Sequence, residues 1–177
     1  MLQNLFKPRP AEAAGKALYA SAARQARMPA FYLELGVPDS GEGRFELYCV
    51  HVALLVRRLK GQGEAAADTA QALFDAFVRA LDDGLREMGV GDLVVGKRMR
   101  KLGEAFYGRM RAIDDALALA PQTAVLAELM ERTVLLQGPK QGAAALAAYA
   151  VRAADSLDRQ PLEALLGGAA EWPGTPA

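Results

Sequence analysis

Three long stretches of the sequence repeat apolar residues at alternating spacings of three and four. They are Phe45–Leu59, Leu73–Met88 and Val95–Leu117. Because an α-helix turns once every 3.6 residues, these spacings place the apolar side chains on one face of a helix. Such helices become stable when several of them bury their apolar faces against one another. The pattern therefore predicts an all-α fold whose core is built mainly from these three helices.

Glycine and proline mark where these helices end and where others begin. Gly61, Gly89 and Pro121 close the three stretches, since neither residue type continues a helix well. Three further helices are expected, over residues 11–27, 122–137 and 141–158. Residues 31–35 are too short to classify, and residues 36–43 have the composition of a loop. No segment alternates regularly enough to predict a strand, so we expect about six helices.

The ends of the chain differ in composition from the middle. We expect residues 1–10 to be a flexible segment, residues 11–166 to form a single compact helical domain, and residues 167–177 to be a frayed tail. The first ten residues hold no signal peptide, and no segment approaches the roughly 20 apolar residues that span a bilayer. We therefore expect a soluble protein or one attached to a membrane only at its surface.

The composition excludes several classes of function. The 21 Lys and Arg residues balance 21 Asp and Glu residues, so the net charge is zero and we expect no specific nucleic-acid binding. A single Cys excludes an internal disulfide framework. One Cys and one His cannot fill the usual four-ligand zinc site. We expect no metal and no cofactor.

The charges are nevertheless unevenly placed. Residues 64–92 carry seven acidic residues against two basic ones, whereas residues 97–111 carry six basic residues against Glu104. The six basic residues are Lys97, Arg98, Arg100, Lys101, Arg109 and Arg111. One interpretation is that an acidic and a basic helix lie antiparallel and pair across their exposed faces. The other is that part of the basic set faces outward, because residues 97–101 cannot all point at one neighbour.

Two motifs imitate catalytic or ligand sites. Residues 91–98 nearly match a phosphate-binding loop, but Arg98 replaces the hydroxyl residue that would hold magnesium and no strand precedes it. Cys49 and His51 lie two residues apart, which turns them about 200° from each other on a helix. We expect Cys49 to be a core residue and His51 a packing or hydrogen-bonding one, with a haem ligand as the alternative. Nothing here predicts an enzyme.

Three motifs in the second half of the chain point further. They are Leu85–Asp92 (LREMGVGD), Gly96–Met99 (GKRM) and Phe106–Arg109 (FYGR). Four upstream segments accompany them: Arg27–Tyr32, Val37–Asp39, Gly43–Glu46 and Arg57–Leu59. Over residues 17–157 the chain resembles the ubiquinol–cytochrome c chaperone family, which includes the mitochondrial assembly factor for cytochrome b. The Ala- and Arg-rich composition is typical of a bacterial member. The resemblance then implies a cytoplasmic protein, with peripheral contact to the cytoplasmic face of the inner membrane as an alternative.

The resemblance implies a non-enzymatic assembly chaperone that binds newly made cytochrome b and assists biogenesis of the ubiquinol–cytochrome c reductase complex. The partner-binding residues expected from it and from the charge pattern are Lys97, Arg98, Arg100, Lys101, Phe106, Tyr107 and Arg109. An ion pair of Arg109 with Asp83, Glu87 or Asp92 is an equal alternative. An adaptor that binds the ribosome or an anionic membrane surface through the basic helix face is the alternative function.

Three glycines in the basic helix need an explanation. Gly96, Gly103 and Gly108 each cost about 1 kcal/mol of helix stability relative to Ala. The close approach of another backbone, within the fold or from a bound helix, would explain them.

Overall fold

The structure is a computed structural model that describes residues 10–175, and of residues 92 and 93 the backbone alone. The described chain is all-α, which confirms the predicted fold class, and six of its eight α-helices are longer than one or two turns. The α-helices are α1 (Pro10–Ala26), α2 (Pro29–Leu33), α3 (Gly41–Leu59), α4 (Glu64–Glu87), α5 (Asp92–Leu117), α6 (Ala124–Arg132), α7 (Ala143–Arg159) and α8 (Leu162–Leu166). A single 3-10 turn, η1 (Lys140–Gly142), precedes α7.

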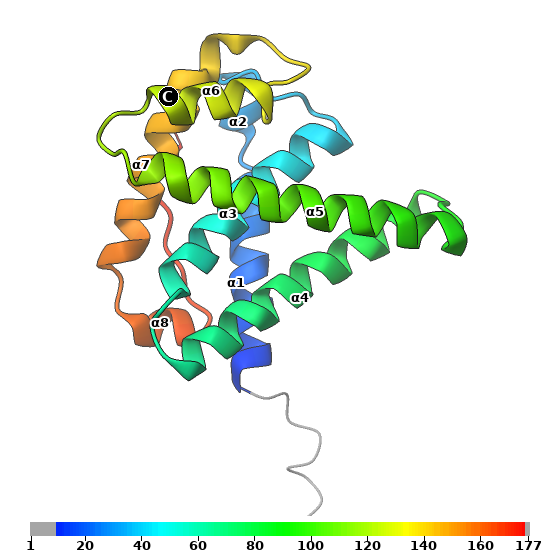
Figure 1. Cartoon of the computed structure of the whole chain (residues 1–177), viewed down its shortest axis with the longest axis vertical. Helices are drawn as coiled ribbons and strands as arrows, with labels where there is room; N and C mark the ends of the chain where they lie inside the picture. The colour runs from blue at the N-terminus through cyan, green and yellow to red at the C-terminus, as the bar shows by residue number, and fades with distance from the viewer. Residues whose placement is uncertain (1–9, 176–177) are drawn as a thin grey trace, which may run out of the picture.

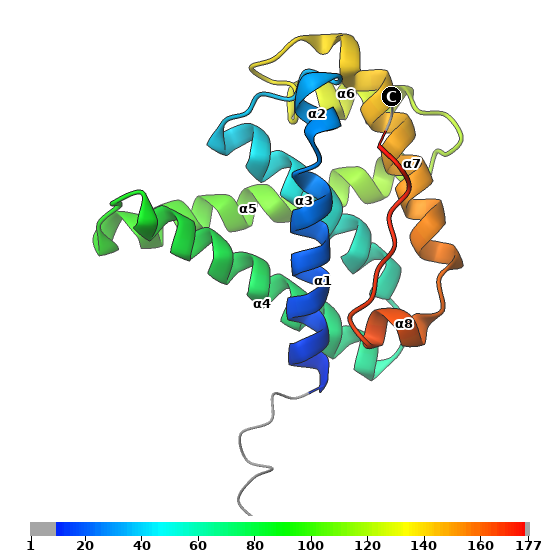
Figure 2. The same cartoon turned by 180° about the vertical axis from the view of Figure 1, so that it is seen from behind.

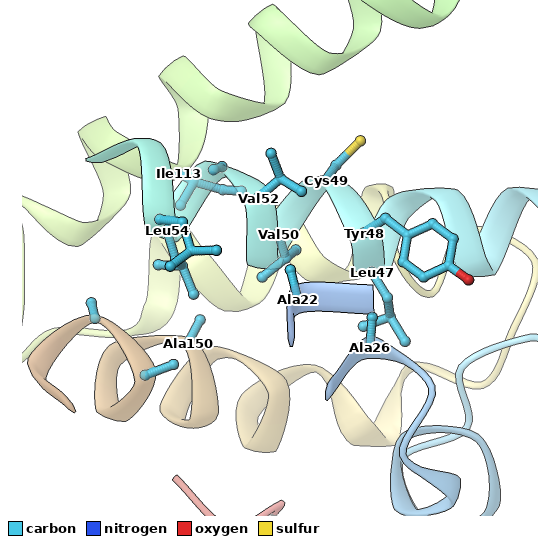
Figure 3. Packing of buried hydrophobic residues seen from close by; sticks show 14 of the residues in the cluster. Ala22, Ala26, Leu47, Tyr48, Cys49, Val50, Val52, Leu54, Ile113 and Ala150 are labelled. Atoms are coloured by element: carbon cyan, nitrogen blue, oxygen red, sulfur yellow. The ribbon is translucent and has the colours of Figure 1, made fainter. Parts of the chain in front are cut away.

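Helix α3 lies at the centre of the molecule and is in contact with α1, α4, α5 and α7 (Figures 1 and 2). Every residue from Leu47 to Leu55 is buried, so the helix is covered on all sides rather than on the single face that its spacing predicts. Figure 3 shows Cys49 and Val52 directed to the side of α3 on which α5 lies, while Leu47 and Leu54 point toward the side occupied by α1 and α7. The protein is thus built as helices packed around α3.

Helices α1 and α4 cross at the closest backbone approach in this part of the fold. A Cβ atom added to Gly15 would lie 2.5 Å from the backbone carbon of Ala72 and from the backbone nitrogen of Leu73. The buried face of α1 consists largely of small residues, among them Ala14 and Ala22. Small side chains let two helices pack with their backbones nearly in contact, which explains why an Ala-rich helix contributes to the core.

The helix that the sequence predicts over residues 122–137 ends early, at Arg132. Lys140 Nζ donates to the backbone oxygens of Glu131, Leu135 and Leu136, which satisfies carbonyls that the helix no longer pairs. The turn also brings Gly138 against the backbone oxygen of Gly36. A side chain at residue 138 would not fit there, so the loop before α3 and the loop after α6 are fixed against each other.

The segment after α8 does not fray within the described chain. It runs back along α1 and α7, as the red segment in Figure 2 shows. Trp172 Nε1 donates to Ser21 Oγ at 3.0 Å, and Glu171 exchanges two backbone hydrogen bonds with the Gln160 side chain. These contacts overcome the Gly and Pro content from which a frayed tail was expected. The expectation for residues 1–10 lies outside the described residues, except that Pro10 begins α1.

Replacing a glycine by alanine should have opposite effects on stability at the α1–α4 crossing and on the open side of α5. Gly15→Ala should lower the free energy of unfolding by about 2 kcal/mol, because the added methyl overlaps the α4 backbone. Gly103→Ala in α5 is the matched control. No atom lies within 4 Å of its added Cβ, so the better helix propensity of Ala should raise the same free energy by up to about 1 kcal/mol. Urea denaturation measures both, and a stabilising Gly15→Ala would contradict the crossing geometry.

Candidate partner-binding surface

Helices α4 and α5 form a long hairpin that projects from the rest of the molecule (Figures 1 and 2). The turn at its free end depends on Gly89, whose φ of 76° is in the left-handed region where other residues are strained. Gly89 N donates to Arg86 O, and Val90 N donates to Leu85 O, which closes the end of α4. The sequence motif LREMGVGD therefore encodes a tight turn that reverses the chain.

Aromatic side chains fix the hairpin to the body. The ring of Phe106 in α5 lies 5.3 Å from the ring of Phe74 and 5.2 Å from the ring of Phe77, both in α4. Phe77 also stacks on Phe45 of α3. Phe106 is only 1% exposed, so its prediction as a partner-binding residue is corrected. It is the first residue of the FYGR motif, and the next residue, Tyr107, faces outward.

Arg109 joins the hairpin to the central helix. Its Nε and Nη2 atoms donate to the two carboxylate oxygens of Glu46 in α3 at 2.8 and 2.9 Å. This bidentate hydrogen bond raises the pKa of Arg109, because it stabilises the charged guanidinium. The alternative of an intramolecular pair is therefore the one the structure favours, but the partner is Glu46 and not an acidic residue of the hairpin. Arg109 is half-buried, and Glu46 occupies its guanidinium.

The other four basic residues of the predicted partner-binding set are exposed. Lys97, Arg98, Arg100 and Lys101 form no ion pair with any residue whose side chain the structure describes. Asp82 of α4 instead pairs within its own helix, with Arg86 at 2.6 Å. The interpretation in which acidic α4 neutralises these four residues of α5 is therefore not supported. The basic side chains are directed to solvent.

These exposed residues form two faces of α5. The basic face follows the spacing three, four and seven through Val94, Lys97, Arg98 and Lys101. A second face, here called the glycine face, follows the spacing four, seven and eleven through Gly96, Arg100, Gly103 and Tyr107. Five of the seven predicted partner-binding residues lie on these two faces.

The glycine face is open. An added Cβ would meet nothing within 4 Å at Gly96, Gly103 or Gly108, so no close approach within the described fold explains these residues. Tyr107 is 55% exposed, while its ring lies 5.4 Å from Phe74. The glycine face thus combines glycines with one exposed aromatic side chain, whose ring packs on Phe74.

Two apolar residues near the free end of the hairpin are exposed, which the helical spacing does not predict. Met88, the last residue of the second apolar stretch, is 70% exposed, and Val94 is 48% exposed. Leu85 and Val95, on the same two helices, are buried instead. The position of Met88 after the last full turn of α4 was the available signal, since a residue there no longer follows the helical face.

His51 and Cys49 belong to the core. His51 is fully buried, with Nδ1 at 2.8 Å from Leu47 O and Nε2 at 2.9 Å from the Tyr149 hydroxyl. Because a carbonyl oxygen can only accept, Nδ1 donates and Nε2 accepts from Tyr149, whose oxygen in turn accepts from Gln25. Both ring nitrogens are thus used, which leaves none for a haem iron. Burial also raises the pKa of the Cys49 thiol.

The remaining ligand-site candidates are not brought together. Residues 91–98 connect two helices and lie within the first turns of α5, so they lack the strand-loop-helix geometry of a phosphate-binding loop. Over the described chain, no three His, Cys, Asp or Glu side chains are placed to share a metal ion. No helix of residues 10–175 is long and apolar enough to cross a membrane. The features that stand out are exposed faces of one helix, which are typical of a protein that acts by binding.

Comparison with known proteins agrees with this class. The family model described as "Ubiquinol-cytochrome C chaperone" matches residues 33–172. The chain therefore belongs to the ubiquinol–cytochrome c chaperone family. It is also similar to the crystal structure of the Cbp3 homolog from Brucella abortus, with 34% sequence identity, a TM-score of 0.86, and coverage of 99% of this chain and 98% of that one. A comparison with curated proteins finds no match.

The buried imidazole makes stability depend on pH. Burial lowers the pKa of His51 to about 4, whereas an unfolded His titrates near 6.5. Between these values the unfolded chain binds a proton that the folded chain does not. The free energy of unfolding should thus be highest above pH 6.5 and fall by roughly 2 kcal/mol as the pH is lowered to 5.

The matched variant is His51→Gln, which does not titrate and whose amide can still accept from Tyr149. Because the chain has one His, this variant should show little dependence between pH 6.5 and 5, even if it is less stable throughout. Urea denaturation at several pH values measures this. The same slope in both proteins would contradict a neutral, buried His51.

Proposed function

We propose that this chain is an assembly chaperone of the ubiquinol–cytochrome c reductase complex and that its client is newly made cytochrome b. Membership of the chaperone family over residues 33–172 carries the proposal. The similarity to the Cbp3 homolog over nearly the whole of both chains supports it. The chaperone would act in a bacterial cytoplasm and would bind its client without catalysing a reaction.

The glycine face is the surface proposed to contact the client. Each glycine inside α5 costs helix stability, and at Gly96 and Gly103 the fold gains no contact in return. A second helix could approach closely along these positions, in the way that small residues allow helices of membrane proteins to pack. Cytochrome b, as a membrane protein, presents apolar helices of this kind before it is assembled.

Two side chains of the same face provide anchors. Tyr107 is exposed but its ring is held against Phe74 and Phe106, at centroid distances of 5.4 and 5.9 Å. Arg100 has no ion-pair partner among the described side chains, so its charge is available to an acidic group at the end of a client helix. Tyr and Arg are the residues that most often dominate binding energy at interfaces, particularly where they are preorganised.

A pair of matched substitutions tests the surface. Gly103→Leu should reduce the amount of cytochrome b recovered after in-cell crosslinking by at least fivefold, because the added side chain fills the path of the client helix. Gly84→Leu is the control, since Gly84 lies in α4 of the same hairpin and an added Cβ also meets nothing within 4 Å. Neither change should destabilise the protein, which urea denaturation checks.

The possible outcomes separate the parts of the proposal. Equal loss or equal retention of cytochrome b in the two variants would overturn the glycine face as the client surface. Recovery of ribosomes without cytochrome b from the unsubstituted protein would overturn the client itself and favour the ribosome-binding alternative. Replacing Tyr107 by a photoreactive phenylalanine derivative should give a direct crosslink to cytochrome b, whereas the same replacement at Arg152 of α7 should not.

A further inference from the structure

The basic face is a second surface of the hairpin, separate from the glycine face. Lys97, Arg98 and Lys101 lie within about one turn of α5, and all three are exposed. None of them forms an ion pair with a described side chain. In a protein of zero net charge, this leaves a dense local positive charge that no described carboxylate pairs with.

The hairpin keeps its opposite charges on different sides. Asp83 and Glu87 are each two residues from the buried Leu85, so they point about 160° away from it around α4. Lys97 is likewise two residues from the buried Val95 of α5. Because the two helices turn Leu85 and Val95 inward, acidic side chains leave one side of the hairpin and basic side chains leave the other. Glu104 is the one acidic residue near the basic face.

Exposed apolar side chains accompany the basic face. Val94 belongs to that face and is 48% exposed, and Met88 at the same end of the hairpin is 70% exposed. The turn that carries them is the part of the hairpin farthest from the body in both views (Figures 1 and 2). Such a projecting end fits a flat partner, whereas small ligands are held in concave sites.

We propose that the free end of the α4–α5 hairpin binds the surface of an anionic lipid bilayer. Lys97, Arg98 and Lys101 contact the headgroup phosphates, and Met88 and Val94 enter the boundary between headgroups and acyl chains. Clusters of basic residues with adjacent apolar side chains bind anionic membranes in this way. The apolar residues favour a bilayer over a nucleic acid, whose phosphates offer such side chains no place to insert.

The proposed contact has a consequence for the glycine face. Gly103 and Tyr107 point about 140° and 180° away from Arg98 around α5, so a chaperone bound by its basic face keeps them accessible. The inference does not depend on which client is bound. Membrane binding is measured with the chaperone alone, and its failure would leave the crosslinking test of the glycine face unaffected.

Flotation of the full-length protein with vesicles tests the inference. In 50 mM salt the protein should float with vesicles of 30% phosphatidylglycerol in phosphatidylcholine and should not float with phosphatidylcholine alone. Lys97→Glu/Lys101→Glu should weaken this binding more than tenfold, because two cations become anions at the headgroup level. Arg152→Glu/Arg159→Glu is the matched control, since it changes the net charge equally on exposed residues of α7 and should weaken binding less than twofold.

A second pair of substitutions separates a bilayer from other polyanions. Met88→Ser/Val94→Ser should weaken vesicle binding and leave binding to a single-stranded RNA oligonucleotide unchanged. Absence of flotation at 50 mM salt, equal binding to neutral vesicles, or equal loss in the α7 control would each overturn the inference. RNA binding as tight as vesicle binding, with no effect of the serine variant on either, would assign the basic face to a nucleic acid.

Discussion

The complete burial of the middle of α3, from Leu47 to Leu55, is the constraint on which the rest of the structure depends. A helix covered on every side must satisfy each polar group that it carries, and His51 is the group that tests this. The hydrogen bonds of His51 to Leu47 O and to Tyr149 satisfy both ring nitrogens. Because Tyr149 is in α7, they also require α7 to pack in one register. The Gln25 side chain of α1 donates to the same Tyr149 oxygen, so a single polar chain sets three helices relative to one another.

The hairpin is attached to this centre by two different kinds of contact. One is apolar packing among the rings of Phe74, Phe77 and Phe106. The other is the Arg109–Glu46 ion pair, whose geometry fixes the orientation of α5. Together they leave the outer half of α5 with neighbours only in α4. A helix that is rigid at its base and open along its sides can present side chains to two partners at once, which is the arrangement that the proposed client and bilayer contacts require.

Much of this architecture could be predicted from the sequence, because helical spacing depends only on local geometry. The apolar stretches located α3, α4 and α5, and the charge pattern correctly singled out α5 as the exposed basic helix. The burial of Phe106 follows from its place in the apolar stretch Val95–Leu117, whereas the pairing of Arg109 with Glu46 could not be predicted, since it depends on where α3 lies. Phe106 and Tyr107 are adjacent aromatic residues of one motif, yet a rotation of 100° puts one in the core and the other in solvent.

The segment after α8 is a second feature that a local sequence pattern could not predict. Its Gly and Pro content predicts disorder, but backbone groups there bind Gln160, and Trp172 binds Ser21. The Trp172–Ser21 pair joins residues 151 positions apart, so it leaves no trace in a local pattern. Only the presence of a lone Trp near the end of a sequence poor in aromatic residues hinted that the segment packs.

That Trp also gives the molecule an internal optical probe. Trp172 is the single Trp of the chain, and its indole lies edge-on to the His51 ring at a centroid distance of 5.0 Å. Indole emission depends on polarity and is quenched by a nearby imidazolium. The fluorescence of the unmodified protein therefore reports, without an attached dye, whether the final segment is docked and the centre of the fold is dry.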